Sequence, residues 1–140
     1  MSLRAAIILA TIFAAVLPFS SLSLAASDEE IAILAVKSSA AFKCSIYAHL
    51  FDDQKEQLRL FQIGLKAGRD FVEAMKNRDE ARNMMKPLPW VSTDFMVGSM
   101  YDAEATKAQN EIPSEQRFTS SEHNNPARVR YQESNCSLIN

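Results

Sequence analysis

Residues 27–50 read SDEEIAILAVKSSAAFKCSIYAHL, and this stretch decides the fold. Ser27 and Glu30 have the spacing of a capping box, in which each side chain accepts a hydrogen bond from the other residue's backbone amide. Apolar residues then recur at helical spacing over a wide arc, which predicts a largely buried central helix ending near Leu50. Its expected core positions are Ile33, Val36, Ala40, Cys44, Tyr47 and Phe51, with Ala35, Phe42, Ile46 and His49 beside them.

The next stretch predicts a second helix that begins at Asp52 or Asp53 and ends near Asn77. Gly64 and Gly68 are four residues apart and therefore share a helix face, although each costs about 1 kcal/mol relative to alanine. We interpret them as a helix-packing notch against the first or the fourth helix, with an approaching ligand as the alternative. The expected core positions are Leu58, Phe61, Leu65, Val72 and Met75, widened by Leu60, Ala67, Phe71 and Ala74.

The charged residues 77–85 are compatible with a short third helix, which Pro87 and Pro89 would end because proline lacks the backbone donor. Ser92 or Thr93 can then cap a helix that runs to about Glu111.

Residues 114–125 are polar and are expected to form a loop, and a short segment after Pro126 is expected to return Val129 and Tyr131 to the core. The chain has 3 glycines, and apolar and polar residues do not alternate with period two. The sequence thus predicts an all-α fold, a small bundle of four to five helices.

Residues 1–26 have the pattern of a cleavable signal peptide. Arg4 precedes an apolar run from Ala5 to Phe19, which at about 15 residues is shorter than the roughly 20 needed to span a membrane. Small residues follow, and we place the cut near Ala25 or Ala26; an uncleaved membrane anchor is the alternative. The expected organisation is a signal peptide, residues 1–26, and a single helical domain, residues 27–140, that is periplasmic or secreted.

The charge balance limits the classes of partner. The full chain carries a formal net charge of −2, and loss of Arg4 with the leader makes it −3. Nucleic-acid binding requires a basic surface, and an anionic membrane attracts polybasic patches; this sequence has neither. We therefore expect no nucleic-acid partner and no stable membrane insertion after cleavage of the signal peptide.

The mature chain contains Cys44 and Cys136 as its 2 cysteines. In an exported protein an even count predicts a disulfide, here between the first helix and the C-terminal end. A loop of roughly 90 residues would gain about 4–5 kcal/mol from the loss of chain entropy in the unfolded state. The alternatives are a buried free thiol at Cys44 and an intermolecular bridge through Cys136.

Catalytic motifs are missing from the sequence. Neither a Gly-x-Ser-x-Gly turn nor His-Glu-x-x-His occurs, and His49 and His123 are expected to be a core histidine and a solvated loop residue. Glycoside hydrolysis needs two acids facing each other across a cleft, and sequence spacing selects no such pair. The acids available are Asp52, Asp53, Asp70, Glu73, Asp94, Asp102 and Glu104. No cofactor is predicted.

Methionine and tryptophan suggest two further hypotheses. Met84, Met85, Met96 and Met100 supply thioethers, which suit Cu(I), but methionine is also a common gap-filler in small cores. The segment Pro87-Leu88-Pro89-Trp90 is the predicted partner-binding element, because prolines reduce the entropy lost on binding and tryptophan is a frequent hot-spot residue. The alternative is that Trp90 covers the helix core.

Several stretches resemble a set of small exported helical proteins of bacteria and their phages. These are Phe42-Lys43-Cys44-Ser45-Ile46-Tyr47, the helix from Arg59 to Phe71 that contains both glycines, Ser92-Thr93-Asp94-Phe95, and the closing Asn135-Cys136. The resemblance covers most of the mature chain and implies the helical fold and the disulfide. It carries no assigned activity.

Together these features predict an exported, non-enzymatic protein-binding domain of the bacterial envelope, of the inhibitor, immunity-protein or lysis-regulator type, with an envelope or phage-related protein as its partner. An envelope hydrolase acting through paired carboxylates, or a carrier of Cu(I) or another small ligand through methionines, is the alternative. The assignment rests on analogy of class, because no single site in the sequence carries it.

Overall fold

The computed structural model describes residues 26–78, 91–114 and 125–140, and this part of the chain is helical without strands. Its elements are α1 (Asp28–Leu50), α2 (Gln54–Lys76), α4 (Thr93–Asn110), α5 (Pro126–Glu133) and the short 3-10 helix η2 (Cys136–Leu138). The predicted all-α class is confirmed. The predicted signal peptide, most of the short third helix and most of the polar loop fall outside the described residues.

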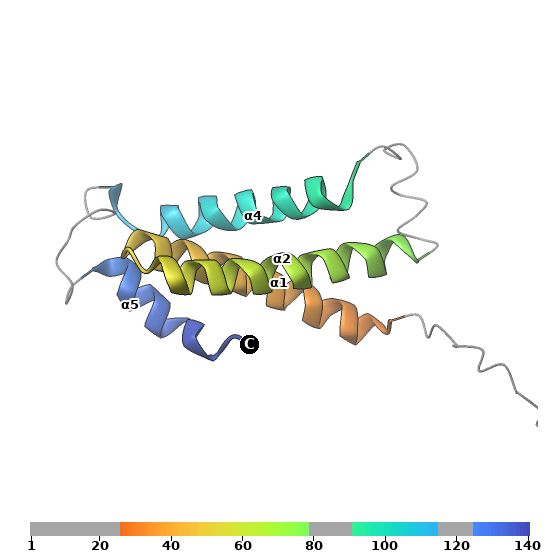
Figure 1. The fold of residues 1–140 in the computed structure, drawn as a ribbon, viewed down its shortest axis with the longest axis horizontal. Coiled ribbons are helices and arrows are strands. Elements are labelled where there is room, and N and C mark those ends of the chain that lie inside the picture. The colour runs from red at the N-terminus through yellow and green to blue at the C-terminus, as the bar shows by residue number, and fades with distance from the viewer. Residues whose placement is uncertain (1–25, 79–90, 115–124) are drawn as a thin grey trace, which may run out of the picture.

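The three long helices lie lengthwise beside one another, and α5 and η2 pack across one end (Figure 1). Helix α1 contacts each of the other elements, which makes it the central helix that the sequence predicted. By length and composition α1 could also cross a membrane, but half of its most apolar window is buried inside the bundle. Burial of that kind is what the core helix of a folded domain shows.

Side chains cap the helices where the sequence placed their first residues. Ser27 and Glu30 form the expected capping box, with the Ser27 amide donating to Glu30 Oε2 at 2.7 Å and the Glu30 amide donating to Ser27 Oγ at 3.2 Å. Asp53 accepts from the Glu56 amide at 3.0 Å at the start of α2. Ser92 accepts from the Phe95 amide at 3.1 Å, so Ser92 rather than Thr93 caps α4. Each bond satisfies an amide that lacks an intrahelical acceptor.

Two buried clusters make up the core. One surrounds the disulfide, where Tyr47 of α1, Leu60 of α2 and Ile112 after α4 are all buried. The other lies between α1, α2 and α4 around Phe42, whose ring meets the Tyr101 ring edge-on at 5.3 Å between centroids. Edge-to-face packing of this kind stabilises a pair beyond the area that it buries.

The predicted glycine notch lies in the second cluster, where α1, α2 and α4 meet. A Cβ built on Gly64 would lie 2.6 Å from Phe42 Cδ1. One built on Gly68 would lie 2.8 Å from Ser38 Oγ and 3.0 Å from Val97 Cγ1. Ser38, buried in α1, also donates its hydroxyl to the Gly64 carbonyl at 2.9 Å. The glycines therefore serve the close approach of the first and the fourth helix to the second.

Several predicted core residues are exposed instead. Ile33 and Val36 of α1 are 57% and 68% exposed, although we expected both to lie in the core. The reason is that α2 and α4 cover one side of α1, while α5 has only 8 residues and covers the other side only near the C-terminal end of α1. The same correction applies to Leu58 and Val129, which are exposed, and to His49, which is not a core histidine.

Candidate functional site

The predicted partner-binding segment, Pro87 to Trp90, lies outside the described residues, as do Met84, Met85 and His123. The roles suggested for them stay predictions. Met96 and Met100 are described, and both pack against the buried cluster around Phe42. This placement is that of core gap-fillers.

Most of the carboxylates considered for hydrolysis are engaged with cations or helix ends. Asp94 accepts from Arg69 Nε at 2.8 Å, and Glu104 pairs with Lys107 at 2.7 Å. Asp53 caps α2, and Asp70 pairs with Lys66. Glu73 pairs with Lys76 and accepts a hydrogen bond from Thr93. The remaining two, Asp52 and Asp102, are exposed. Among the described residues, no group of three or more His, Cys, Asp or Glu side chains could hold a metal ion.

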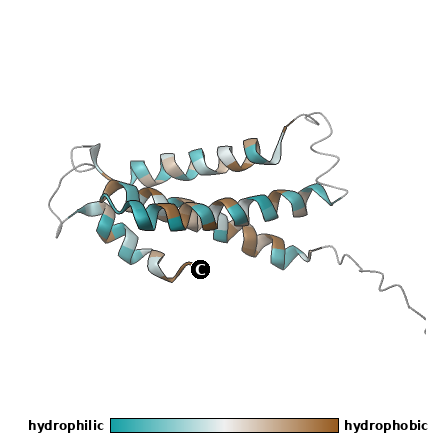
Figure 2. Ribbon diagram, in the orientation of Figure 1, coloured by the Kyte–Doolittle hydropathy of each residue, from teal (hydrophilic) through white to brown (hydrophobic). Residues whose placement is uncertain are grey.

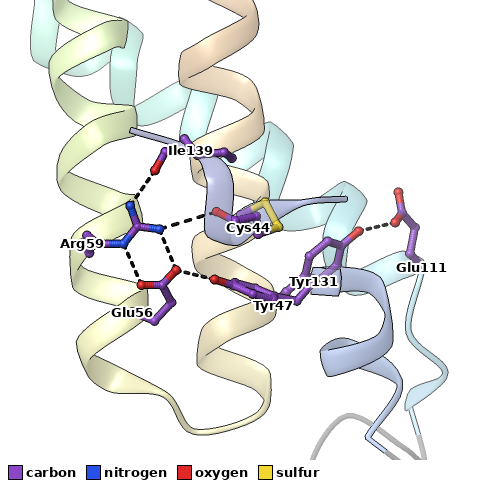
Figure 3. Close-up of a disulfide and its surroundings, with 8 residues drawn as sticks. Cys44, Tyr47, Glu56, Arg59, Glu111, Tyr131 and Ile139 are labelled. Atoms are coloured by element: carbon purple, nitrogen blue, oxygen red, sulfur yellow. Dashed lines mark hydrogen bonds and ion pairs between the residues drawn. A yellow bond between two sulfur atoms is a disulfide. The ribbon is translucent and has the colours of Figure 1, made fainter. Parts of the chain in front are cut away.

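The predicted disulfide is present and joins the C-terminal tail to α1, and hydrogen bonds from Arg59 fix the tail to α2 (Figure 3). Cys44 and Cys136 are buried, with Cα atoms 5.6 Å apart. Arg59 of α2 donates to the carbonyl of Ile139 at 2.5 Å and to that of Cys136 at 3.5 Å. Glu56 holds the guanidinium through both carboxylate oxygens at 2.7 Å. A sulfur pair shielded from attacking thiolates is structural, not a site of thiol exchange.

Two tyrosines hydrogen-bond to carboxylates near the disulfide. Tyr47 donates to Glu111, which also binds Lys43 Nζ at 2.5 Å, and Tyr131 donates to Glu56. Burial, and then the hydrogen bond to Glu111, raise the pKa of Tyr47; burial and the bond to Glu56 raise the pKa of Tyr131 to about 12. At neutral pH both hydroxyls stay protonated, so they serve as hydrogen-bond donors that join the tail and the end of α4 to α1 and α2.

These contacts predict loss of stability at both ends of the pH scale. The hydrogen bond from Arg59 lowers the pKa of Glu56 in spite of burial. Burial raises the pKa of Glu111, but the hydrogen bonds from Lys43 and Tyr47 outweigh it, so the net shift is downward. A lowered carboxyl pKa stabilises the fold above the ordinary value near 4.5, and this contribution is lost as the pH falls below it.

A raised tyrosine pKa acts in the opposite direction. It stabilises the fold below the ordinary value of 10.0, and for Tyr131 this contribution is lost between pH 10 and about 12. Urea unfolding followed by circular dichroism at pH 3 to 11 should therefore give a plateau near neutrality with a fall on each side. In Tyr131→Phe the alkaline fall should be shallower; an identical alkaline limb in this variant would contradict the assignment.

An open apolar groove runs between the N-terminal half of α1 and the fixed tail. It has a volume of about 600 Å³. Leu138, Ile139 and Asn140 form the tail wall, and α1 supplies the other wall with Glu29, Ala32, Ile33, Val36, Lys37 and Ala40. The α1 positions recur at three- and four-residue intervals, which places them on one face of the helix.

The groove gathers apolar side chains that the bundle leaves in contact with solvent. Ile33, Val36 and Leu138 are exposed to 57%, 68% and 71%. Figure 2 shows hydrophobic residues on this half of α1 and on the tail near the C-terminus. Isolated exposed apolar residues are ordinary, and the contiguous set that lines this groove makes it the candidate docking surface.

The sequence signalled only part of this groove. The apolar positions of α1 were recognised, but they were assigned to the core, because periodicity shows which residues share a face and not what covers that face. Leu138 was not singled out. The signal that could have found it is the apolar pair Leu138-Ile139 directly after Cys136, which a disulfide would hold beside α1.

Comparison with known proteins leaves the site to be interpreted from its own geometry. No protein-family model matches the chain, and no curated protein or solved structure matches it either.

Proposed function

We propose that this chain is an exported, non-enzymatic protein-binding domain of the bacterial envelope, of the inhibitor, immunity-protein or lysis-regulator type. Its partner is a polypeptide that presents apolar side chains from a helix to the groove between α1 and the tail. The observation that carries the proposal is the groove itself, with Ile33, Val36 and Leu138 exposed on walls that a disulfide and Arg59 hold in place.

Rigidity and shape support helix binding. A wall fixed before binding loses little conformational entropy in the complex, so more of the apolar burial is available for affinity. Grooves that receive an amphipathic helix recognise side chains spaced three and four residues apart. The α1 wall has this spacing, and its small residues, Ala32 and Ala40, leave room for a second helix to approach.

Site-specific photo-crosslinking tests the proposal. A benzophenone amino acid is incorporated at position 36 of the full chain, cells that export the protein are irradiated, and adducts are detected by an antibody to the chain. We expect a discrete adduct of defined mass from position 36. The matched control is position 102, where Asp102 is exposed on α4 away from the groove-lining residues, and it should give none.

Two further arms make the test decisive. Ile33→Asp in the position-36 background places a charge in the groove and should reduce the adduct at least tenfold; an undiminished adduct would contradict binding through the groove. A probe at position 90 tests the predicted role of Trp90. Adducts from position 90 together with none from position 36 would assign binding to the Pro87–Trp90 segment and refute the groove.

A further inference from the structure

The ends of the α1 wall carry opposite charges. Glu29 lies at the N-terminal end of the apolar positions and Lys37 towards the C-terminal end, with Ile33 and Val36 between them. Neither charged group has an ion-pair partner among the described residues of its own chain, although nearby Asp28 pairs with Arg78. The face is therefore an apolar strip bounded by one anion and one cation that have no ion-pair partner in the described part of the chain.

This arrangement is complementary to itself in one orientation. If a second α1 lies antiparallel, with a two-fold axis between Ile33 and Val36, each Ile33 meets the Val36 of the second copy. At a rise of about 1.5 Å per residue, Glu29 of one copy is then offset along the axis from Lys37 of the other by only about 4.5 Å, within reach of a lysine side chain. A parallel pair would instead set Glu29 against Glu29 and Lys37 against Lys37.

Small residues favour the same pairing. Ala32 and Ala40 flank the strip on α1, and in this arrangement they lie level with Lys37 and Glu29 of the second copy, so that their small side chains leave room for the two charged ones. The two-fold arrangement uses the same patch on both copies, which is how most homodimers assemble.

We propose that the groove is occupied by α1 of a second copy of this chain, in an antiparallel, two-fold symmetric dimer. This rests on the proposed function in one respect, since both use the groove as a docking face, and it names the helix that docks there. The contact is short, and interfaces below about 1,200 Å² are generally weak, so we expect dissociation in the micromolar range or above. Self-association would then compete with any envelope partner for the same face.

The test measures mass against concentration. The full chain is expressed with its leader and purified from the periplasm, and sedimentation velocity is run from about 5 to 500 µM. The mass of the wild type should rise from one chain towards two, and Val36→Asp should remain monomeric throughout. Val36 is exposed, so thermal unfolding of Val36→Asp should match that of the wild type.

Charge reversal tests the orientation. Glu29→Lys or Lys37→Glu alone places like charges at both symmetric contacts and should weaken the dimer about tenfold. The double reversal restores two attractive pairs and should return the dissociation constant to within about threefold of the wild type. A double variant as weak as the product of the single effects would overturn the antiparallel arrangement.

The outcomes separate the two proposals. A wild type that stays monomeric up to 500 µM would overturn the dimer, while a position-36 adduct whose mass differs from that of two chains would still support partner binding through the groove. An adduct from position 36 that has the mass of two chains supports the dimer, provided that Ile33→Asp in the same background abolishes it. Monomer at every concentration together with no adduct would refute both.

Discussion

Replacement of both Cys44 and Cys136 by alanine should lower the free energy of unfolding by about 4 kcal/mol. The bridge joins residues 92 positions apart, and opening so long a loop restores about 4–5 kcal/mol of chain entropy to the unfolded state. Total stabilities of small domains are about 5–15 kcal/mol, so the loss is a large part of the whole. Alanine is preferred to serine because both positions are buried and a hydroxyl there would need a new partner.

Urea unfolding followed by circular dichroism measures this effect. Wild-type protein unfolded in the presence of a reductant should lose a similar free energy, which controls for the side-chain truncation. The variant should also bind less well through the groove, because the tail wall loses its covalent link to α1. A double-alanine variant within about 1 kcal/mol of the wild type would show that the remaining tail contacts, including those of Arg59, suffice to hold the fold.

Substitution of Gly64 by alanine should destabilise the domain by a net of about 1–2 kcal/mol. The new methyl group would lie 2.6 Å from Phe42 Cδ1, and the Phe42 ring has no room to move because Phe61 and Tyr101 pack against it. Overpacking of this kind typically costs about 1–3 kcal/mol and here exceeds the roughly 1 kcal/mol that alanine contributes to helix formation. Separation of α1 and α2 would also lengthen the bond from Ser38 to the Gly64 carbonyl.

Gly98 provides the matched control. It lies on the exposed side of α4, and a Cβ built there meets nothing within 4 Å. Gly98→Ala should therefore stabilise the domain by about 0.5–1 kcal/mol, through the helix preference alone. Thermal and urea unfolding of the two variants should move in opposite directions. If both were stabilised, α1 and α2 would not approach each other as closely at Gly64 as the structure indicates.

Local signals in the sequence correctly predicted where the three long helices begin. Ser27, Asp53 and Ser92 each accept a hydrogen bond from the amide three residues further along the chain, a contact that depends only on neighbours in the chain. Spacing also identified the glycine notch, because two glycines four residues apart share a face in any α-helix. Spacing could not show which side chains pack into the notch. In the structure Phe42 of α1 packs against Gly64, and side chains of both α1 and α4 pack against Gly68.

The candidate site was less accessible to sequence reasoning. Its tail wall depends on η2 and on hydrogen bonds from Arg59 to Ile139 and Cys136, residues about 80 positions away in the chain. Tyr131 and Glu56, which pair across a similar separation, carry no local sign of each other. Contacts of this range follow from how the helices pack, and no periodic pattern encodes them.

By itself the sequence determined that the described part of the chain would be helical, where its long helices would begin, and which two sulfurs were available to close it, because capping, spacing and cysteine count act through local chemistry. Only the tertiary structure decided that Ile33 and Val36 face solvent rather than the core. An apolar helix face is buried where another element covers it, and α5 is too short to reach this half of α1. The same residues that the sequence assigned to the interior thus became one wall of the groove.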